Sequence, residues 1–365
     1  MALRENIYYW KCDRPSSFFS IKGENGAVQV EKRVMEMLID YFGGWDFTFS
    51  RANGQGNHLT YIAVHNGTSY FVRIENGPEG DEYMEVESKL INQVRPLGVP
   101  TPHIYAVDAW RTRYPFAWQL MEMVPYPDLN HLYKAGTLDS ETVMRQLGRY
   151  IALWQQITTN GYGPYNTDLL RLNGEMVGLL PAYRDYYLLN LERHLGFLVQ
   201  KKFIPAPQAN RITELVKINE DYLDIPNGCL VHKDIALWNL LGDSKTIHSV
   251  IDWDDAVSGD PTDDLSLIGC FHSGSEMRAL IEGYCSVKPL PEEFEKRFYL
   301  HMLRNMVFKA VIRVGAGYFE KGGDFFLISS SEGGESLRRE TLGRISAACE
   351  GLGGGKSVFE LTINN

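Results

Sequence analysis

Two short apolar runs, each ending in charged residues, constrain this chain more than any other feature. The first starts at Leu230 and carries His232 and Asp234, with Asn239 five residues after that aspartate. The second places Asp252 directly after two β-branched residues. Such runs are typical of buried strands, whose ends present polar side chains to an open site. The sequence therefore predicts one site that contains two carboxylates and an amide.

Phosphoryl transfer requires this set of side chains. Its transition state demands positioning and charge neutralisation, so one carboxylate orients the attacking hydroxyl while oxygen ligands hold the Mg²⁺ ions that bridge the nucleotide phosphates. Asp234 is the predicted catalytic base, and Asn239 and Asp252 are the predicted metal ligands. The alternative is that the aspartates are turn residues and that Asn239 caps a helix. That alternative does not explain why both motifs occur in this order.

The wider motif resembles one group of enzymes. His232-Lys233-Asp234 with its following asparagine, the run Ile251–Ala256 and the turn Gly259-Asp260-Pro261 resemble the aminoglycoside phosphotransferase and choline kinase-like family of small-molecule kinases. The resemblance implies a two-lobed, protein-kinase-like α+β fold, with a small N-terminal lobe built on an antiparallel sheet and a larger, mainly helical C-terminal lobe. It also implies ATP or GTP and Mg²⁺ as cofactors.

Three segments are expected along the chain. They are a leader packed on the body over residues 1–28, a nucleotide-binding N-lobe over 29–125 and a C-lobe over 126–365. The N-lobe is expected to begin with a helix over 31–42, followed by strands that Gly and Asn clusters separate. Within the C-lobe, residues 165–227 look least like the family and are expected to supply helices to the acceptor site.

A linker with two glycines, between the first two expected strands, is the candidate phosphate loop. Gly54, Gly56 and Asn57 would let backbone N–H groups approach nucleotide phosphates closely, because small side chains leave room. The alternative is an ordinary turn, but the position of the linker before Arg73 favours phosphate binding. The later cluster Gly351–Lys356 lacks the Gly-Lys-Ser/Thr spacing of a phosphate loop and is expected to be a flexible loop.

The resemblance assigns four further residues to the nucleotide. Arg73 matches a basic residue of the third strand that contacts the α- and β-phosphates and pairs with a helix glutamate. Glu87 is the better candidate for that partner, and Glu85 is its rival. The main chain near Glu122 and Val124 is expected to be the hinge that hydrogen-bonds the adenine.

Four residues are candidates for contact with the acceptor. Asp185, Tyr186 and Glu192 lie in the segment before the catalytic motif, where helices of this family supply much of the acceptor wall. Asp254 stands where the family usually has glutamate and is the fourth candidate. Clustered tyrosines more often serve packing, so the structural interpretation stays open here.

Three residues are expected to support the catalytic loop. His232 is interpreted as a structural residue and not as a base. Asp260, between a glycine and a proline, suits a tight turn, and Asp264 is expected to anchor the loop by a charge-assisted hydrogen bond. Lys233 stands where the family commonly has a small residue. Its ammonium either helps to neutralise the transferring phosphoryl group or points to solvent.

Composition and charge argue against several other classes of protein. A formal net charge of −10 and the absence of a Lys/Arg-rich run argue against nucleic acid as a substrate or partner. The acidic balance favours a cationic acceptor, or it reflects solubility alone. The five cysteines are scattered, and no apolar run is long enough to cross a bilayer. We therefore expect reduced thiols, a cytoplasmic location and no membrane partner.

The resulting hypothesis is an ATP- and Mg²⁺-dependent kinase that phosphorylates a hydroxyl group of a small molecule. The first candidate acceptor is an aminoglycoside-like or other antibiotic. One alternative is a housekeeping kinase of choline, an amino alcohol, an amino acid or a sugar. Another is a nucleotide-binding regulatory protein that has kept the fold and lost the chemistry, although the presence of Asp234, Asn239 and Asp252 argues against it.

Overall fold

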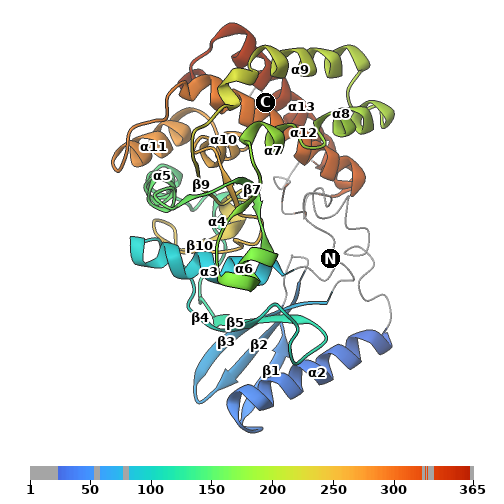
Figure 1. Ribbon diagram of the computed structural model, residues 1–365, viewed down its shortest axis with the longest axis vertical. Helices are drawn as coiled ribbons and strands as arrows, with labels where there is room; N and C mark the ends of the chain where they lie inside the picture. Colours follow the sequence, from blue (N-terminus) through green and yellow to red (C-terminus); the bar gives the residue numbers. More distant parts are fainter. Residues whose placement is uncertain are drawn as a thin grey trace.

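The computed structural model has a small sheet at one end and a mostly helical body at the other (Figure 1). The described residues are 24–52, 58–76, 82–322, 325, 327 and 333–361. Gly54, Gly56 and Asn57 of the candidate phosphate loop lie outside the described residues, as do residues 1–23 of the expected leader.

An antiparallel sheet forms the N-lobe, as predicted. Its five strands lie in the order β1-β2-β3-β5-β4. They are β1 (Phe47–Arg51), β2 (Leu59–His65), β3 (Thr68–Glu75), β4 (Ile104–Asp108) and β5 (Ala117–Glu122). Their aromatic and β-branched residues favour the extended backbone, and the pairing of β3 with β5 places β3, which carries Arg73, at the centre of the sheet.

Helix α2 (Glu24–Phe42) runs along the sheet in Figure 1. Its buried Val34 and Met37 are three residues apart and belong to the same core as the sheet, as expected for an amphipathic helix. The helix starts before the expected boundary at residue 31. Gly26 lies within its first turns, and a glycine there weakens a helix by only about 1 kcal/mol without stopping it.

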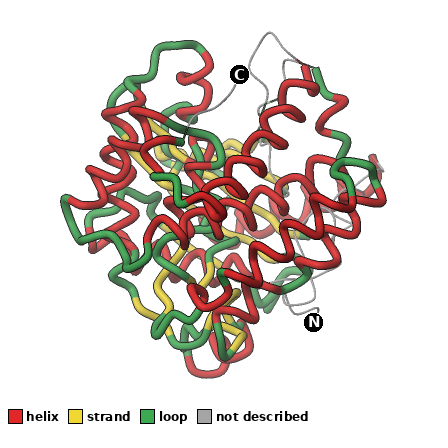
Figure 2. The backbone as a smooth tube through the Cα atoms, turned by 90° about the horizontal axis from the view of Figure 1, so that it is seen from above, coloured by secondary structure: helices red, strands yellow, loops and turns green. Residues whose placement is uncertain are grey.

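Helices make up most of the C-lobe, and Figure 2 shows them crossing over its shorter strands. The helices after α2 are α3 (Tyr83–Val94), α4 (Leu129–Lys134), α5 (Ser140–Trp154), α6 (Thr167–Asn173), α7 (Tyr183–Leu188), α8 (Leu191–Gln200), α9 (Ala206–Ile218), α10 (Asp263–Gly269), α11 (Gly274–Cys285), α12 (Phe294–Gly315) and α13 (Gly333–Gly354). The C-lobe strands are β6 (Thr158–Thr159), β7 (Tyr162–Tyr165), β8 (Gly178–Leu180), β9 (Gly228–Val231), β10 (Leu240–Gly242), β11 (Ile247–Val250) and β12 (Val257–Gly259). They form a two-stranded β10-β11 sheet and a sheet in the order β6-β9-β12-β7-β8.

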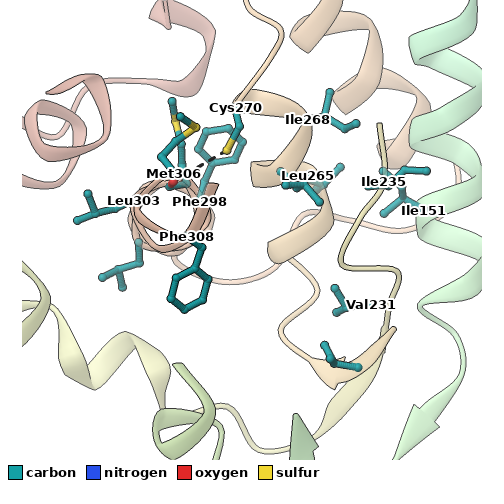
Figure 3. Packing of buried hydrophobic residues seen from close by; sticks show 14 of the residues in the cluster. Ile151, Val231, Ile235, Leu265, Ile268, Cys270, Phe298, Leu303, Met306 and Phe308 are labelled. Atoms are coloured by element: carbon teal, nitrogen blue, oxygen red, sulfur yellow. Dashed lines mark hydrogen bonds between the residues drawn. The ribbon is translucent and has the colours of Figure 1, made fainter. Parts of the chain in front are cut away.

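Two separate hydrophobic cores account for the two-lobed α+β architecture, which is confirmed. Val72 and Leu120 belong to the smaller core, between the sheet and α2. The larger core extends through the C-lobe and includes Leu303 and Met306 of α12 (Figure 3). The apolar side of α3 joins this larger core, so α3 holds Glu87 at the junction of the lobes.

Two glycines allow helices α5 and α11 to pack closely. A Cβ atom at Gly148 would lie 1.9 Å from the carbonyl oxygen of Leu280, and one at Gly283 would lie 1.9 Å from that of Arg145. We expect Gly148→Ala to lower the free energy of unfolding by about 1–3 kcal/mol, measured by urea denaturation, because the helices must separate. The control Gly196→Ala has open space around the added methyl group, so it should leave stability unchanged or raise it. Equal stability of the two variants would contradict this account.

Residues 351–354 of the glycine cluster near the end of the described chain are helical, which corrects the expectation of a flexible loop there. Helix α13 continues to Gly354, and a Cβ atom at Gly351 would lie 2.5 Å from the ring of Tyr299. The cluster therefore includes a glycine that packing against α12 requires, and this need outweighs its low helix propensity. None of the helices in the described residues is both long and apolar enough to cross a membrane.

Candidate active site

Strand β9 leads into residues 232–239, the candidate catalytic segment, at the junction of the lobes. All four residues of β9 are buried, and β12 pairs with it in antiparallel register, Val257 opposite Val231. The chain leaves β9 at His232 and passes Asp234 before a short 3₁₀ turn, Leu237–Asn239, leads into β10. A buried strand with a fixed register thus sets the position of the polar residues that follow it.

Asp264, in the first turn of α10, anchors this segment. Its carboxylate accepts hydrogen bonds from the backbone N–H groups of His232 (2.9 Å) and Lys233 (3.0 Å) and from the indole N–H of Trp154 (3.0 Å). Three donors on one buried carboxylate hold the backbone of the catalytic segment rigidly. Asp264 lies where the expected anchoring role requires it.

His232 joins the two sequence motifs. Its Nε2 lies 3.0 Å from the carbonyl oxygen of Ile251, the residue before Asp252, and the ring packs against Trp253 with centroids 4.5 Å apart. Burial lowers the pKa of His232 to about 4, so the ring is neutral and donates from Nε2 to this carbonyl. A neutral, fully buried ring with these contacts positions the loop.

Lys233 has a role that neither of its sequence interpretations anticipated. Its ammonium is buried and contacts both carboxylate oxygens of Asp263, at 2.9 and 2.7 Å, and the Oδ1 of Asn305 at 2.7 Å. The residue adopts a left-handed backbone conformation, with φ of 70°, which turns the side chain into the C-lobe. Lys233 therefore ties the catalytic segment to α10 and α12.

Asp260 makes a second buried ion pair below the site. Arg297 of α12 donates to its carboxylate at 2.8 and 2.7 Å, and the backbone N–H of Thr262 donates at 2.7 Å. The neighbouring His301 and Arg297 outweigh burial and hold the pKa of Asp260 well below its usual range. This residue fixes the turn between β12 and α10.

Asp234 occupies a setting suited to a base. Asn239 donates from Nδ2 to the carboxylate Oδ2 (3.2 Å) and to the carbonyl oxygen of Asp234 (2.7 Å), while Lys309 of α12 lies 3.6 Å from Oδ1. Burial raises the pKa of Asp234 to about 6, although the ammonium of Lys309 opposes this shift. A carboxylate with such a pKa is ionised near neutral pH and is a stronger base than an exposed aspartate.

Asp252 follows β11 and carries a strained backbone. Its φ of 68° is uncommon for a residue with a side chain, although aspartate tolerates it better than most. The backbone N–H of Ile251 donates to the carbonyl oxygen of Asn239 at 3.0 Å, which brings the two predicted metal ligands together. Withdrawal from solvent and the neighbouring carboxylate of Asp254 raise the pKa of Asp252 well above its usual range.

The side-chain oxygens of Asn239 and Asp252 are suitable ligands for Mg²⁺. Because the amide nitrogen of Asn239 is used by Asp234, the carbonyl oxygen of this amide is the atom left for a metal. A crowded Asp252 carboxylate favours a bound cation, since a cation relieves the repulsion from Asp254. No group of three or more His, Cys, Asp or Glu side chains in the described residues is placed to hold a metal alone. Mg²⁺ needs no such cage when nucleotide phosphates and water complete its coordination.

Arg73 connects the N-lobe to Asp252. Its guanidinium contacts Glu87 of α3 at 2.7 and 2.5 Å and Asp252 at 3.1 Å. The Glu87 carboxylate also accepts the backbone N–H of Trp253 at 3.1 Å. Glu85, the rival partner, has no ion pair or hydrogen bond to Arg73 in the described residues, so the structure pairs Arg73 with Glu87.

The hinge candidates lie at the end of β5. The backbone N–H of Glu122 donates to the carbonyl oxygen of His103 (2.8 Å), and the Val124 carbonyl accepts from Tyr126 (2.9 Å). These residues lie where the chain passes from the sheet to α4.

The candidate acceptor residues are scattered. Asp185 and Glu192 are exposed in the first turns of α7 and α8, and no hydrogen bond or ion pair joins either to Asp234 within the described part of the chain. Tyr186 is buried, with the guanidinium of Arg304 stacked 4.3 Å from its ring centre. Asp254 lies in the site, 3.3 Å from His58 Nε2.

Sequence reasoning missed three residues of this region, namely Lys309 and the partners of Lys233, Asp263 and Asn305. Lys309 and Arg313 are four residues apart, so they share one side of a mostly buried helix. The spacing indicates that this side of the helix is charged, but it does not indicate which residues the charged side contacts.

Comparison with known proteins supports the same interpretation. A profile of the phosphotransferase enzyme family matches residues 48–297, which is more than half of the chain. This chain belongs to the phosphotransferase enzyme family. The predicted family is therefore confirmed, and the protein is a phosphotransferase by descent. A search of curated proteins found no significant match.

Solved structures of other phosphotransferases share the fold. A thermostable variant of aminoglycoside phosphotransferase APH(4)-Ia, in ternary complex with ADP and hygromycin B, has a TM-score of 0.60 at 16% identity, covering 88% of this chain and 99% of that chain. Spectinomycin phosphotransferase APH(9)-Ia, with ADP and spectinomycin, has a TM-score of 0.53 at 16% identity, covering 88% and 97%. These matches establish the kinase-like fold of this phosphotransferase.

Proposed function

We propose that the protein is an ATP- and Mg²⁺-dependent phosphotransferase that phosphorylates a hydroxyl group of a small molecule. The observation that carries this proposal is the convergence of Asp234, Asn239 and Asp252 beside the Arg73–Glu87 ion pair. A regulatory protein without chemistry would have no use for a carboxylate with a raised pKa next to this set.

Each residue has a defined part in the proposed reaction. Asp234 hydrogen-bonds the acceptor hydroxyl and takes its proton as the oxygen forms a bond to the γ-phosphorus. The bond between that phosphorus and the β–γ bridging oxygen breaks, and ADP leaves with its electron pair. Arg73 steadies the nucleotide phosphates, and Asn239 and Asp252 would hold Mg²⁺. Bound Mg²⁺ would neutralise the negative charge that develops on the phosphates during the transfer.

The pH dependence of turnover follows from Asp234. Only the ionised carboxylate accepts a proton, and burial raises its pKa to about 6. We therefore expect kcat/KM to fall as pH drops through about 6, with a tenfold loss for each further pH unit. Because the ammonium of Lys309 lowers this pKa, Lys309→Met should move the acid limb to higher pH. A limb near pH 4, as for an exposed aspartate, would contradict the assignment.

The acceptor class is tested by magnesium-dependent ADP release against a panel of hydroxyl compounds. Hygromycin B and spectinomycin belong in it because structures of similar fold bind them. Choline, ethanolamine, serine and simple sugars represent the housekeeping alternative. Stimulation by one class, lost when magnesium is chelated, supports the proposal. Tight binding of a non-hydrolysable ATP analogue without stimulation by any acceptor would favour the regulatory alternative.

A further inference from the structure

Three successive residues of the loop between β11 and β12, residues 252–254, each contact a different side chain of the N-lobe. The first accepts a hydrogen bond from Arg73 of β3 at 3.1 Å, and the second donates its backbone N–H to Glu87 of α3 at 3.1 Å. The third contact joins Oδ2 of Asp254 to Nε2 of His58 at 3.3 Å. The first two contacts belong to the site described above, whereas the third has no assigned role.

His58 directly precedes β2 and lies on the same side of the sheet as Arg73. Thr60 of β2 is paired with Arg73 of β3, so these two side chains share a face of the sheet. Side chains alternate along a strand, which places His58, two residues before Thr60, on that face as well. Because Arg73 serves the nucleotide phosphates in the proposed reaction, His58 lies on the nucleotide side of the N-lobe.

The contact between His58 and Asp254 is shielded from solvent. The two side chains are only 10% and 17% exposed. A carboxylate accepts hydrogen bonds and does not donate them, so Nε2 of the ring is the donor. Hydrogen bonds to charged groups are stronger than neutral ones, and shielding from water and salt preserves them. The pair therefore holds the two lobes together next to the predicted metal ligand Asp252.

The other ring nitrogen of His58 argues against a purely stabilising role. Nδ1 is buried and has no hydrogen-bond partner in the described part of the chain. An unsatisfied buried nitrogen costs free energy, so this ring adds less to stability than a fully paired histidine would. The position of the ring is better explained by what its contact with Asp254 does for the site.

The contact also supports a strained residue. Asp252 has a φ of 68°, and such a conformation persists only where the surrounding structure enforces it. The two residues that follow Asp252 are fixed by their hydrogen bonds to Glu87 and His58. His58 therefore helps to orient a predicted metal ligand that it does not touch.

We propose that His58 is a positioning residue for the nucleotide. Through Asp254 it sets the separation between Arg73 and Asp252, where the phosphates and Mg²⁺ bind. A preorganised site loses less freedom when its ligand binds, so the contact raises the affinity for the nucleotide phosphates. This inference rests on the proposed function, and it assigns Asp254 to nucleotide binding instead of acceptor binding.

The test measures the affinity of the full-length protein for two ligands by calorimetry, namely a non-hydrolysable ATP analogue with Mg²⁺ and adenosine. We expect His58→Ala to weaken binding of the ATP analogue about 10-fold, through the loss of a hydrogen bond to a charged group. Adenosine has no phosphates, so its affinity should stay the same. The matched control is His65→Ala at the other end of β2, which should change neither affinity.

Two amide substitutions identify the ring nitrogen that acts. The side-chain amide of glutamine extends about as far as Nε2 of histidine, whereas the shorter asparagine places its amide near the position of Nδ1. Both amides can donate a hydrogen bond. We expect His58→Gln to keep most of the affinity for the ATP analogue, and His58→Asn to lose as much as His58→Ala. These variants also serve if His58→Ala fails to fold.

A double-mutant cycle tests the pairing with Asp254. Removal of the Asp254 charge also changes the field at Asp252, so the effect of His58→Ala is compared in two backgrounds. We expect the roughly 10-fold loss in the wild-type background and almost none in the Asp254→Ala background, because residues in contact act non-additively.

Three results would overturn the inference. The first is that His58→Ala weakens adenosine and the ATP analogue equally, or weakens neither. The second is that His58→Gln loses as much affinity as His58→Asn. The third is that the effect of His58→Ala persists in the Asp254→Ala background. Failure of the proposed function would differ from all three, because it would appear as intact nucleotide binding in the wild type without phosphoryl transfer to any acceptor.

Discussion

Asp234→Asn should reduce kcat by about 10²- to 10⁴-fold, the usual contribution of a general base. The amide retains an oxygen that can accept the hydrogen bond from Asn239 Nδ2, so the local geometry should persist. It cannot take a proton from the acceptor. Affinity for a non-hydrolysable ATP analogue should change little, because the nucleotide phosphates are assigned to Arg73 and the metal. Single-turnover measurements with saturating acceptor separate the chemical step from binding.

Stability gives an independent check on the same variant. A carboxyl whose pKa is raised by folding destabilises the folded protein when it ionises, so this cost is complete above a pH of about 6 and is lost as the pH falls toward the ordinary aspartate pKa of about 4. Asp234→Asn should therefore unfold at the same urea concentration as the wild type at pH 7, or at a higher one. Asp221→Asn, at an exposed position, is the control. Wild-type turnover in Asp234→Asn would exclude this residue as the base.

Lys233→Met should cost about 3–5 kcal/mol of unfolding free energy, because it leaves Asp263 buried without its cation. Urea denaturation measures this loss. The double variant Lys233→Met, Asp263→Asn should be less destabilised than the sum of the single variants, since it removes both buried charges. Exposed Lys245 provides the control substitution Lys245→Met.

Activity measurements on Lys233→Met distinguish this stabilising role of Lys233 from a direct role in phosphoryl transfer. If Lys233 supported the transferring phosphoryl group, Lys233→Met would lose turnover while unfolding at the wild-type urea concentration. We expect the reverse, a less stable protein whose folded fraction still transfers phosphate. The distinction matters because Lys233 lies between two residues of the catalytic motif, and its position in the sequence suggests chemistry.

Local sequence explains why three of the candidate site residues lie close together. Asp234 and Asn239 are five residues apart, and Asp252 follows strand β11, which pairs with the strand β10 directly after Asn239, so secondary structure alone brings their positions into a small volume. The antiparallel sheet was equally predictable from its β-branched and aromatic runs. The sequence left Glu85 as a rival of Glu87, and the contact of Glu87 with Arg73 now distinguishes the two.

Long-range contacts account for what the sequence could not predict. Lys309 reaches Asp234 from a helix far along the chain, and helical periodicity does not say which element each side of α12 faces. The direction of Lys233 depends on a left-handed backbone conformation and on partners in two other helices. Gly351 lies in a helix because Tyr299 packs against it, which overrides the local preference of a glycine cluster.

The most direct test of the central claim is ³¹P NMR of the product formed from Mg²⁺–ATP and a hydroxyl acceptor selected from the panel. We expect a new phosphate monoester resonance that appears with ADP in equal amounts, requires magnesium and is absent with Asp234→Asn. Release of inorganic phosphate alone, or the same ester from Asp234→Asn at the wild-type rate, would contradict it.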